Sequence, residues 1–165
     1  IRGGGWRSVL GNHDQRLLRV ADGKRPRDIT GQDCVELLNP EPGWAEWVAA
    51  LPMFLRVGGW TIVHAGLAPT GQADTTREMA MVMRRWPFRS IEGAAWHEVY
   101  EGPERVVFGH DALRGWVRRD KDGQPYLIGL DTGCVYGGAL TGYVLETNEV
   151  FTVQAAKRYC PVGGF

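Results

Sequence analysis

The sequence predicts an α/β fold built around a mixed β-sheet. Helical and strand patterns are interleaved in the first part of the chain, whereas the last third is rich in strands joined by tight turns. Interleaved helices and strands favour parallel strand pairing, and tight turns favour antiparallel hairpins. A chain of 165 residues suits one domain with its own core, and no linker or repeat marks an internal boundary.

Two helices are predicted from the spacing of apolar residues. The first has apolar residues at i, i+3, i+4 and i+7, namely Trp44, Trp47, Val48 and Leu51. Pro42 and Pro52 bracket this helix. Thr75 and Glu78 form a capping box that predicts the start of the second helix. Its apolar face consists of Met79, Val82, Met83 and Trp86.

Apolar runs separated by turn residues predict the strands. The predicted strands are Ser8–Leu10, Met53–Val57, Trp60–Val63, Arg105–Phe108, Trp116–Arg119, Tyr126–Leu130, Leu140–Leu145 and Val150–Val153. Gly58-Gly59 and Asp122-Gly123 are typical of tight hairpin turns. The polar stretch from Ala21 to Asn39 predicts an exposed loop.

The composition excludes several classes of function. Lysine plus arginine and aspartate plus glutamate number 19 each, so no overall field attracts nucleic acid or acidic membranes. No apolar run approaches the roughly 20 residues needed to span a bilayer, and the first residues resemble no signal peptide. The three cysteines, Cys34, Cys134 and Cys160, show no disulfide pattern. We therefore expect a reducing, cytoplasmic location.

Three apolar runs end in a histidine with a glycine nearby. The three segments are Gly11–Asp14, His64–Leu67 and Gly109–Asp111. The carboxyl ends of strands in α/β sheets are where ligands bind. Asn12, His64 and His110 could therefore supply three ligands to a manganese, iron or zinc ion. Taken singly, each histidine could instead cap a strand end, but the repeated context favours the metal site. His97 lacks this context, and a structural role is expected for it.

These motifs, taken in order, resemble those of one enzyme family. The segments are GNHD at 11–14, VHAGL at 63–67, FGHD at 108–111 and LDTGCVYGGALT at 130–141. Together they resemble the calcineurin-like metallophosphoesterases, in the branch of the serine/threonine protein phosphatases and the symmetrical diadenosine tetraphosphatases. The resemblance covers nearly the whole chain and implies a mixed β-sheet sandwich flanked by helices.

The resemblance implies a role for each candidate residue. Asn12, His64 and His110 would bind the second of two divalent metal ions, with manganese expected first and iron or zinc as alternatives. His13 would be the general acid. An arginine between the second and third motifs would grip the phosphate, and Arg84 is preferred over Arg85; the alternative for either is a solvated charge at a helix end.

Two departures from the family pattern are visible. The family's first motifs, Asp-x-His and Gly-Asp-x-x-Asp-Arg-Gly, do not occur in the sequence. The resemblance therefore implies a single metallophosphoesterase domain over residues 1–165 that lacks its N-terminal part, holds at most one ion and is nearly inactive alone. The second departure is Asp111, where the protein phosphatases commonly have threonine.

The implied function is metal-dependent hydrolysis of phosphoesters by a metal-activated hydroxide. We expect a phosphomonoesterase resembling the serine/threonine protein phosphatases, acting on a phosphorylated protein or a small phosphoester, without membrane or nucleic-acid partners. The net charge is zero and the arginines are scattered, whereas a dinucleotide favours a basic, aromatic-lined groove. The segment 84–89 is the one basic and aromatic cluster that could hold a nucleotide, but Trp86 in it is predicted to be buried on a helix. The alternatives are a symmetrical dinucleoside tetraphosphate hydrolase and a non-catalytic binding module that retains the fold.

Overall fold

A computed structural model of the chain describes residues 5–24 and 41–160. They belong to two compact units, which divide between Met53 and Phe54. Most of the predicted 21–39 loop and Cys34 lie outside the described residues. None of the helices described is both long enough and apolar enough to cross a membrane.

The first unit contains two helices that lie against each other, α1 (Asn12–Ala21) and α3 (Trp44–Ala49). The helix predicted around Trp44 is confirmed. The prediction of a strand at Ser8–Leu10 is wrong: no described strand pairs with it, and the Leu10 N–H instead donates to the Pro52 carbonyl at 2.9 Å. Helix α1 was not predicted, because its first residues were assigned to a ligand-bearing segment that follows this strand.

The second unit is built on a five-stranded mixed sheet in the order β1-β2-β5-β7-β6. Its strands are β1 (Phe54–Val57), β2 (Trp60–Val63), β5 (Arg105–Phe108), β6 (Val117–Lys121) and β7 (Gln124–Gly129). The three central strands β2, β5 and β7 are parallel, and β1 and β6 pair antiparallel at the two edges. Both predicted hairpins and the predicted mixed sheet are thereby confirmed.

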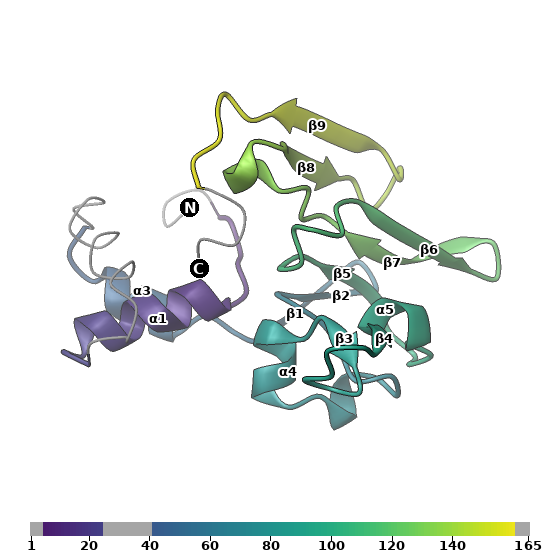
Figure 1. Ribbon diagram of the computed structural model, residues 1–165, viewed down its shortest axis with the longest axis horizontal. Coiled ribbons are helices and arrows are strands. Elements are labelled where there is room, and N and C mark those ends of the chain that lie inside the picture. The colour runs from purple at the N-terminus through teal and green to yellow at the C-terminus, as the bar shows by residue number, and fades with distance from the viewer. Residues whose placement is uncertain (1–4, 25–40, 161–165) are drawn as a thin grey trace. The chain divides into compact units, whose positions relative to one another are not determined.

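Figure 1 shows elements on both sides of this sheet. On one side lie α4 (Arg77–Val82), α5 (Trp96–Val99) and the hairpin of β3 (Arg85–Trp86) with β4 (Ala94–Ala95); on the other lies the hairpin of β8 (Ala139–Tyr143) with β9 (Val150–Gln154). Trp60 packs edge-on against Tyr143 with ring centroids 6.1 Å apart, and Trp96 packs against Phe108 at 4.7 Å. Aromatic side chains therefore join both outer layers to the sheet, which confirms the sandwich.

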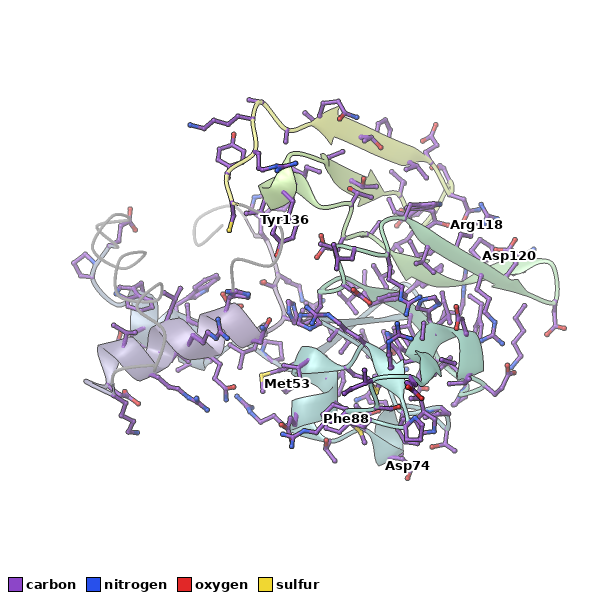
Figure 2. All side chains as sticks on the ribbon, viewed as in Figure 1. Met53, Asp74, Phe88, Arg118, Asp120 and Tyr136 are labelled. Carbon is purple, nitrogen blue, oxygen red and sulfur yellow. The ribbon has the colours of Figure 1, made fainter. Side chains whose placement is uncertain are left out.

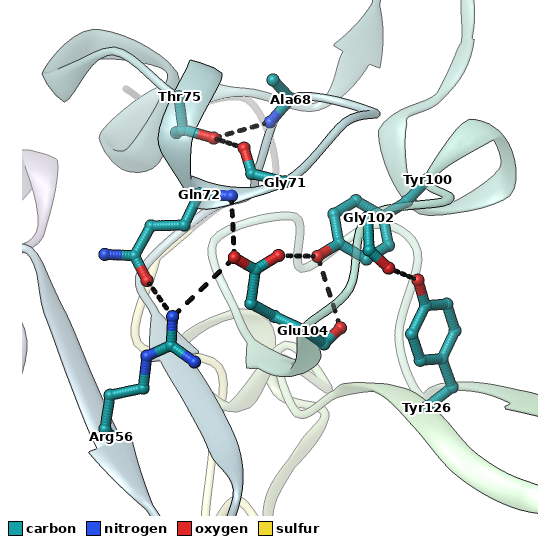
Figure 3. Close-up of polar contacts among 9 residues, drawn as sticks. All are labelled: Arg56, Ala68, Gly71, Gln72, Thr75, Tyr100, Gly102, Glu104 and Tyr126. Atoms are coloured by element: carbon teal, nitrogen blue, oxygen red, sulfur yellow. Dashed lines mark hydrogen bonds and ion pairs between the residues drawn. The ribbon is translucent and has the colours of Figure 1, made fainter.

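The second predicted helix is shorter than expected. Its N-cap is Thr76, whose hydroxyl accepts the Met79 N–H, whereas Thr75 bonds to Ala68 and Gly71 in the preceding loop (Figure 3). The helix ends at Val82, so the prediction that Trp86 continues its apolar face is wrong. Trp86 instead pairs with β4 as part of β3.

A partly buried polar network fixes the loop that leads into β5 (Figure 3). The Tyr100 hydroxyl donates to Glu104 Oε2 at 2.6 Å, and the Gln72 N–H donates to Glu104 Oε1 at 3.2 Å. Arg56 lies 3.8 Å from the same Oε1. Glu104 immediately precedes β5, whereas His110 follows it, so the network is at the opposite end of this strand from the predicted metal ligands.

Candidate metal and phosphate site

Parallel pairing brings the carboxyl ends of β2, β5 and β7 to one edge of the sheet. His64 directly follows β2, and Gly109 and His110 follow β5. The Gly109 N–H donates to the His64 carbonyl at 2.9 Å, and the Leu130 N–H donates to the Phe108 carbonyl at 2.8 Å. Backbone bonds therefore continue past the strand ends and hold the residues that follow them.

The structure brings two of the predicted metal ligands together. His64 Nε2 lies 3.2 Å from His110 Nδ1, and the ring centroids are 5.0 Å apart. Two nitrogens at about 2.1 Å from one ion lie about 3.0 Å apart at a right angle and about 3.4 Å apart in a tetrahedron. The observed distance falls between these values. The pair therefore fits two ligands of one divalent ion, provided that both facing nitrogens are deprotonated.

A left-handed backbone at His110 makes this meeting possible. Its φ is +71°, a conformation that is uncommon for residues with a side chain. The Asp111 N–H donates to the Gly109 carbonyl at 2.9 Å, which closes a tight turn around His110. Such local strain is often found at functional sites, and here it turns the His110 ring toward His64.

The remaining predicted ligand belongs to the other unit. Asn12 is the first residue of α1, and His13, which is exposed, follows it. Their membership of the site remains a prediction. Within residues 5–24 and 41–160, no group of three histidine, cysteine, aspartate or glutamate side chains is placed to hold a metal. A third ligand from this part of the chain would need other chemistry, such as the amide of Asn12.

Of the two candidate phosphate-binding arginines, Arg84 is the better placed. Its Nε lies 3.6 Å from Asp111 Oδ1, beside His110, and its side chain is 58% exposed. Arg85 is directed elsewhere, because its Nη1 donates to the Gly93 carbonyl at 2.6 Å within the β3–β4 hairpin. Arg84 was expected on a helix, but α4 ends at Val82, so the arginine lies in the segment that joins α4 to β3.

Asp111 has close contacts that the sequence did not predict. Its Oδ2 accepts a hydrogen bond from Arg114 Nε at 3.2 Å, and Arg114 Nη1 lies 4.0 Å from Glu98 Oε1. The spacing of Asp111 and Arg114 across a turn was a local signal for their pair. Nothing in the sequence connects Asp111 to Arg84, because they are far apart along the chain.

The LDTGCVYGG segment connects the end of β7 to β8. The Thr132 hydroxyl donates to the Ala139 carbonyl at 2.6 Å, and Asp131 Oδ1 accepts the Gly133 N–H at 3.2 Å. A Cβ added to Gly138 would lie 2.2 Å from the Thr132 carbonyl oxygen, so no larger residue fits there. The motif therefore folds a compact loop, and its glycine is required by packing.

His97 lies within the layer of helices. Its ring stacks on Phe108 with centroids 5.6 Å apart, and burial lowers its pKa. No hydrogen-bond partner for Nε2 is present in the described part of the chain. These contacts agree with the structural role expected for this residue.

Comparisons with known proteins identify the family to which the chain belongs. No protein-family model matches it. The symmetrical bis(5'-nucleosyl)-tetraphosphatase of Neisseria gonorrhoeae is 28% identical, with 90% of this chain and 74% of that protein covered. That of Dechloromonas aromatica is 27% identical, with 90% and 75% covered. A crystal structure described as a candidate diadenosine tetraphosphatase is 30% identical, with a TM-score of 0.71, 92% of this chain and 69% of that chain covered. The chain belongs to the calcineurin-like metallophosphoesterases.

Membership of the calcineurin-like metallophosphoesterases fixes the class of chemistry. The protein is a metal-dependent phosphoric ester hydrolase. Within the aligned region this chain is shorter than its gonococcal relative, because the alignment spans 214 positions, although this chain has only 165 residues. The relative therefore carries segments inside the aligned region that have no counterpart here.

Proposed function

We propose that the protein is a symmetrical dinucleoside tetraphosphate hydrolase. The observation that carries this proposal is that relatives at 28% and 27% identity bear that name. The structure described as a candidate diadenosine tetraphosphatase supports the same substrate class. None of these comparisons names a protein phosphatase, so they favour this function over the phosphomonoesterase expected from the sequence.

The sequence-based prediction against a nucleotide substrate rested on a helix that is not present at Trp86. It required Trp86 to be buried on a helix, but Trp86 is half-buried in the short strand β3. The neighbouring Phe88 is also half-buried, and the Arg89 guanidinium lies 5.6 Å from its ring centroid. Figure 2 labels Phe88 in the layer below the sheet. The segment 84–89 is therefore a loop and short strand with partly accessible aromatic rings.

The proposed mechanism divides the work among few side chains. His64 and His110 would hold a divalent ion, whose chemistry when bound would be that of a Lewis acid toward phosphoryl oxygens. Arg84 would bind phosphate oxygens through its two terminal nitrogens, because Asp111 faces its Nε. His13 would donate a proton to the leaving oxygen. The leaving group in tetraphosphate cleavage is itself a phosphate, with a pKa of about 6, so this proton matters less than for an alkyl phosphate.

The decisive experiment compares two substrates, with manganese, on a protein in which a segment carrying the two absent motifs precedes the chain, because the chain alone is expected to be nearly inactive. Diadenosine tetraphosphate should be cleaved to two molecules of ADP, and it should be preferred to a phosphoserine peptide. The proposal is wrong if the peptide has the higher kcat/KM by tenfold, about 1.4 kcal/mol of transition-state binding. It is also wrong if the dinucleotide yields ATP and AMP, because that cleavage is asymmetrical.

Matched histidine variants provide the control. His64→Ala should abolish cleavage and lower the metal content, because His64 is one of the two ligands that face each other. His97→Asn should keep both, because His97 packs within the helical layer. Equal losses in the two variants would show that the effect comes from general damage to the fold.

A further inference from the structure

We propose that Asp111 is a positioning residue that orients Arg84 to bind the phosphate chain of the substrate. The proposal rests on the proposed function only in that the ligand of Arg84 is a phosphate. Asp111 stands where the protein phosphatases commonly have threonine, and neither the proposed metal site nor the proposed general acid uses it.

Four side chains of alternating charge form a row of ion pairs beside His110. Glu98 Oε1 lies 4.0 Å from Arg114 Nη1, Arg114 Nε donates to Asp111 Oδ2 at 3.2 Å, and Asp111 Oδ1 lies 3.6 Å from Arg84 Nε. These residues come from α5, from the turn after β5 and from the segment after α4. Each oxygen of Asp111 therefore faces a different arginine, and the carboxylate joins three elements.

The burial of each side chain indicates which residues of this row of ion pairs are held in place and which can reach a ligand. The side chain of Asp111 is 17% exposed and that of Arg114 is 28% exposed, whereas that of Arg84 is 58% exposed. Coulombic attraction is stronger where water is partly excluded, so Asp111 and Arg114 form the anchored end. Arg84 is the accessible end. Contact at its Nε leaves the two terminal nitrogens to form the bidentate contact that phosphate accepts.

The backbone directs Asp111 away from the metal ligands. Asp111 is held by its N–H bond to the Gly109 carbonyl, and its own carbonyl accepts the Arg114 N–H, both at 2.9 Å. The left-handed backbone of His110 thus turns the histidine toward His64 and leaves the aspartate with the arginines. No described cluster of three metal-binding side chains includes Asp111, which agrees with a role in positioning rather than in coordination.

The test is a double-mutant cycle, with manganese, on the same protein in which a segment carrying the two absent motifs precedes the chain. Asp111→Asn should lower kcat/KM by about tenfold, mainly by raising KM. Without the carboxylate, the Arg84 guanidinium is no longer held in the orientation that binds phosphate. In an Arg84→Ala background the same change should cost less than about twofold, because the residue that Asp111 orients is already absent. Metal content should not change in Asp111→Asn.

A matched control comes from β6. Asp120 accepts two hydrogen bonds from Arg118, at 2.8 and 3.1 Å, and both side chains are exposed and labelled in Figure 2. Asp120→Asn breaks an aspartate–arginine pair of the same kind on an edge strand. It should leave kcat/KM and metal content unchanged.

Two readouts separate this proposal from the proposed substrate. The cycle is measured with both diadenosine tetraphosphate and p-nitrophenyl phosphate, so failure to cleave the dinucleotide removes the proposed function while the cycle is still decided on the second substrate. Calorimetric titration with inorganic pyrophosphate gives a dissociation constant without turnover, and Asp111→Asn should raise this dissociation constant. If Asp111→Asn does not fold, Arg84→Lys takes its place and should show the same loss.

Several results would overturn the role of Asp111. Loss of metal from Asp111→Asn would show that the carboxylate supports His110 instead. Losses that multiply in the double variant would show that Asp111 acts independently of Arg84. Tighter pyrophosphate binding by Asp111→Asn would show that its charge only repels phosphate. If the protein with the absent motifs restored binds no pyrophosphate and cleaves neither substrate, both proposals are overturned.

Discussion

Replacing Gly66 with any larger residue should destabilise the fold, because a tryptophan side chain occupies the space beside it. A Cβ added at Gly66 would lie 2.7 Å from Cε2 and Nε1 of the Trp96 ring. Such distances are too short for carbon atoms in contact, and Trp96 is only 2% exposed, so the ring has little room to move. Overpacking of a filled core costs about 1–3 kcal/mol. We expect Gly66→Ala to lower the free energy of unfolding by this amount.

Urea denaturation of matched variants measures this cost. Gly142→Ala on β8 is the control, because a Cβ there meets nothing within 4 Å, and it should change the free energy of unfolding by less than about 0.5 kcal/mol. Replacing Trp96 with phenylalanine should open space and reduce the cost of Gly66→Ala. If Gly66→Ala costs no more than the control, or costs the same in both backgrounds, contact with Trp96 is not what requires glycine.

Three further predictions concern the histidines. His13→Asn should lower turnover of a phosphoserine peptide at least tenfold more than turnover of diadenosine tetraphosphate, and equal losses would exclude a role as general acid. Calorimetry should find at most one weak manganese site per chain, lost in His110→Ala; two tight sites would contradict the ligand assignment. Burial holds the pKa of His97 below its usual 6.5, so the folded state binds fewer protons than the unfolded state and stability falls as the pH drops below 6.5. In His97→Phe the free energy of unfolding should fall less steeply as the pH is lowered. An unchanged dependence on pH would show that His97 is not its source.

The sequence predicted the parts of the fold that local chemistry determines. The turns at Gly58-Gly59 and Asp122-Gly123 specify tight hairpins, and both are present. It failed where two local signals competed. Thr75 and Thr76 are both capable N-caps, but Thr75 bonds to the preceding loop, so the cap is one residue later than predicted.

The candidate site was predictable only in part. His64 and His110 were recognised because each follows an apolar run, and parallel strands then bring such positions to the same edge. At Gly66, the glycine of the second motif, the space that a side chain would need is taken by Trp96, and no local signal in the sequence indicates this packing. Contacts such as Arg84 with Asp111 depend on tertiary packing across several elements, and no spacing in the sequence encodes them.

The hydrogen bond from the Gly109 N–H to the His64 carbonyl affects how the candidate site would bind an ion. It extends the parallel pairing of β2 and β5 beyond the named strands, so the backbones that carry the two imidazoles are joined by the same ladder as the core. The two proposed ligands are thus held close together by the backbone, so little conformational entropy would be lost if they bind a metal as proposed. Metal exchange should therefore leave the sheet intact, and the amide of Gly109 should exchange its hydrogen as slowly as those of the central strands.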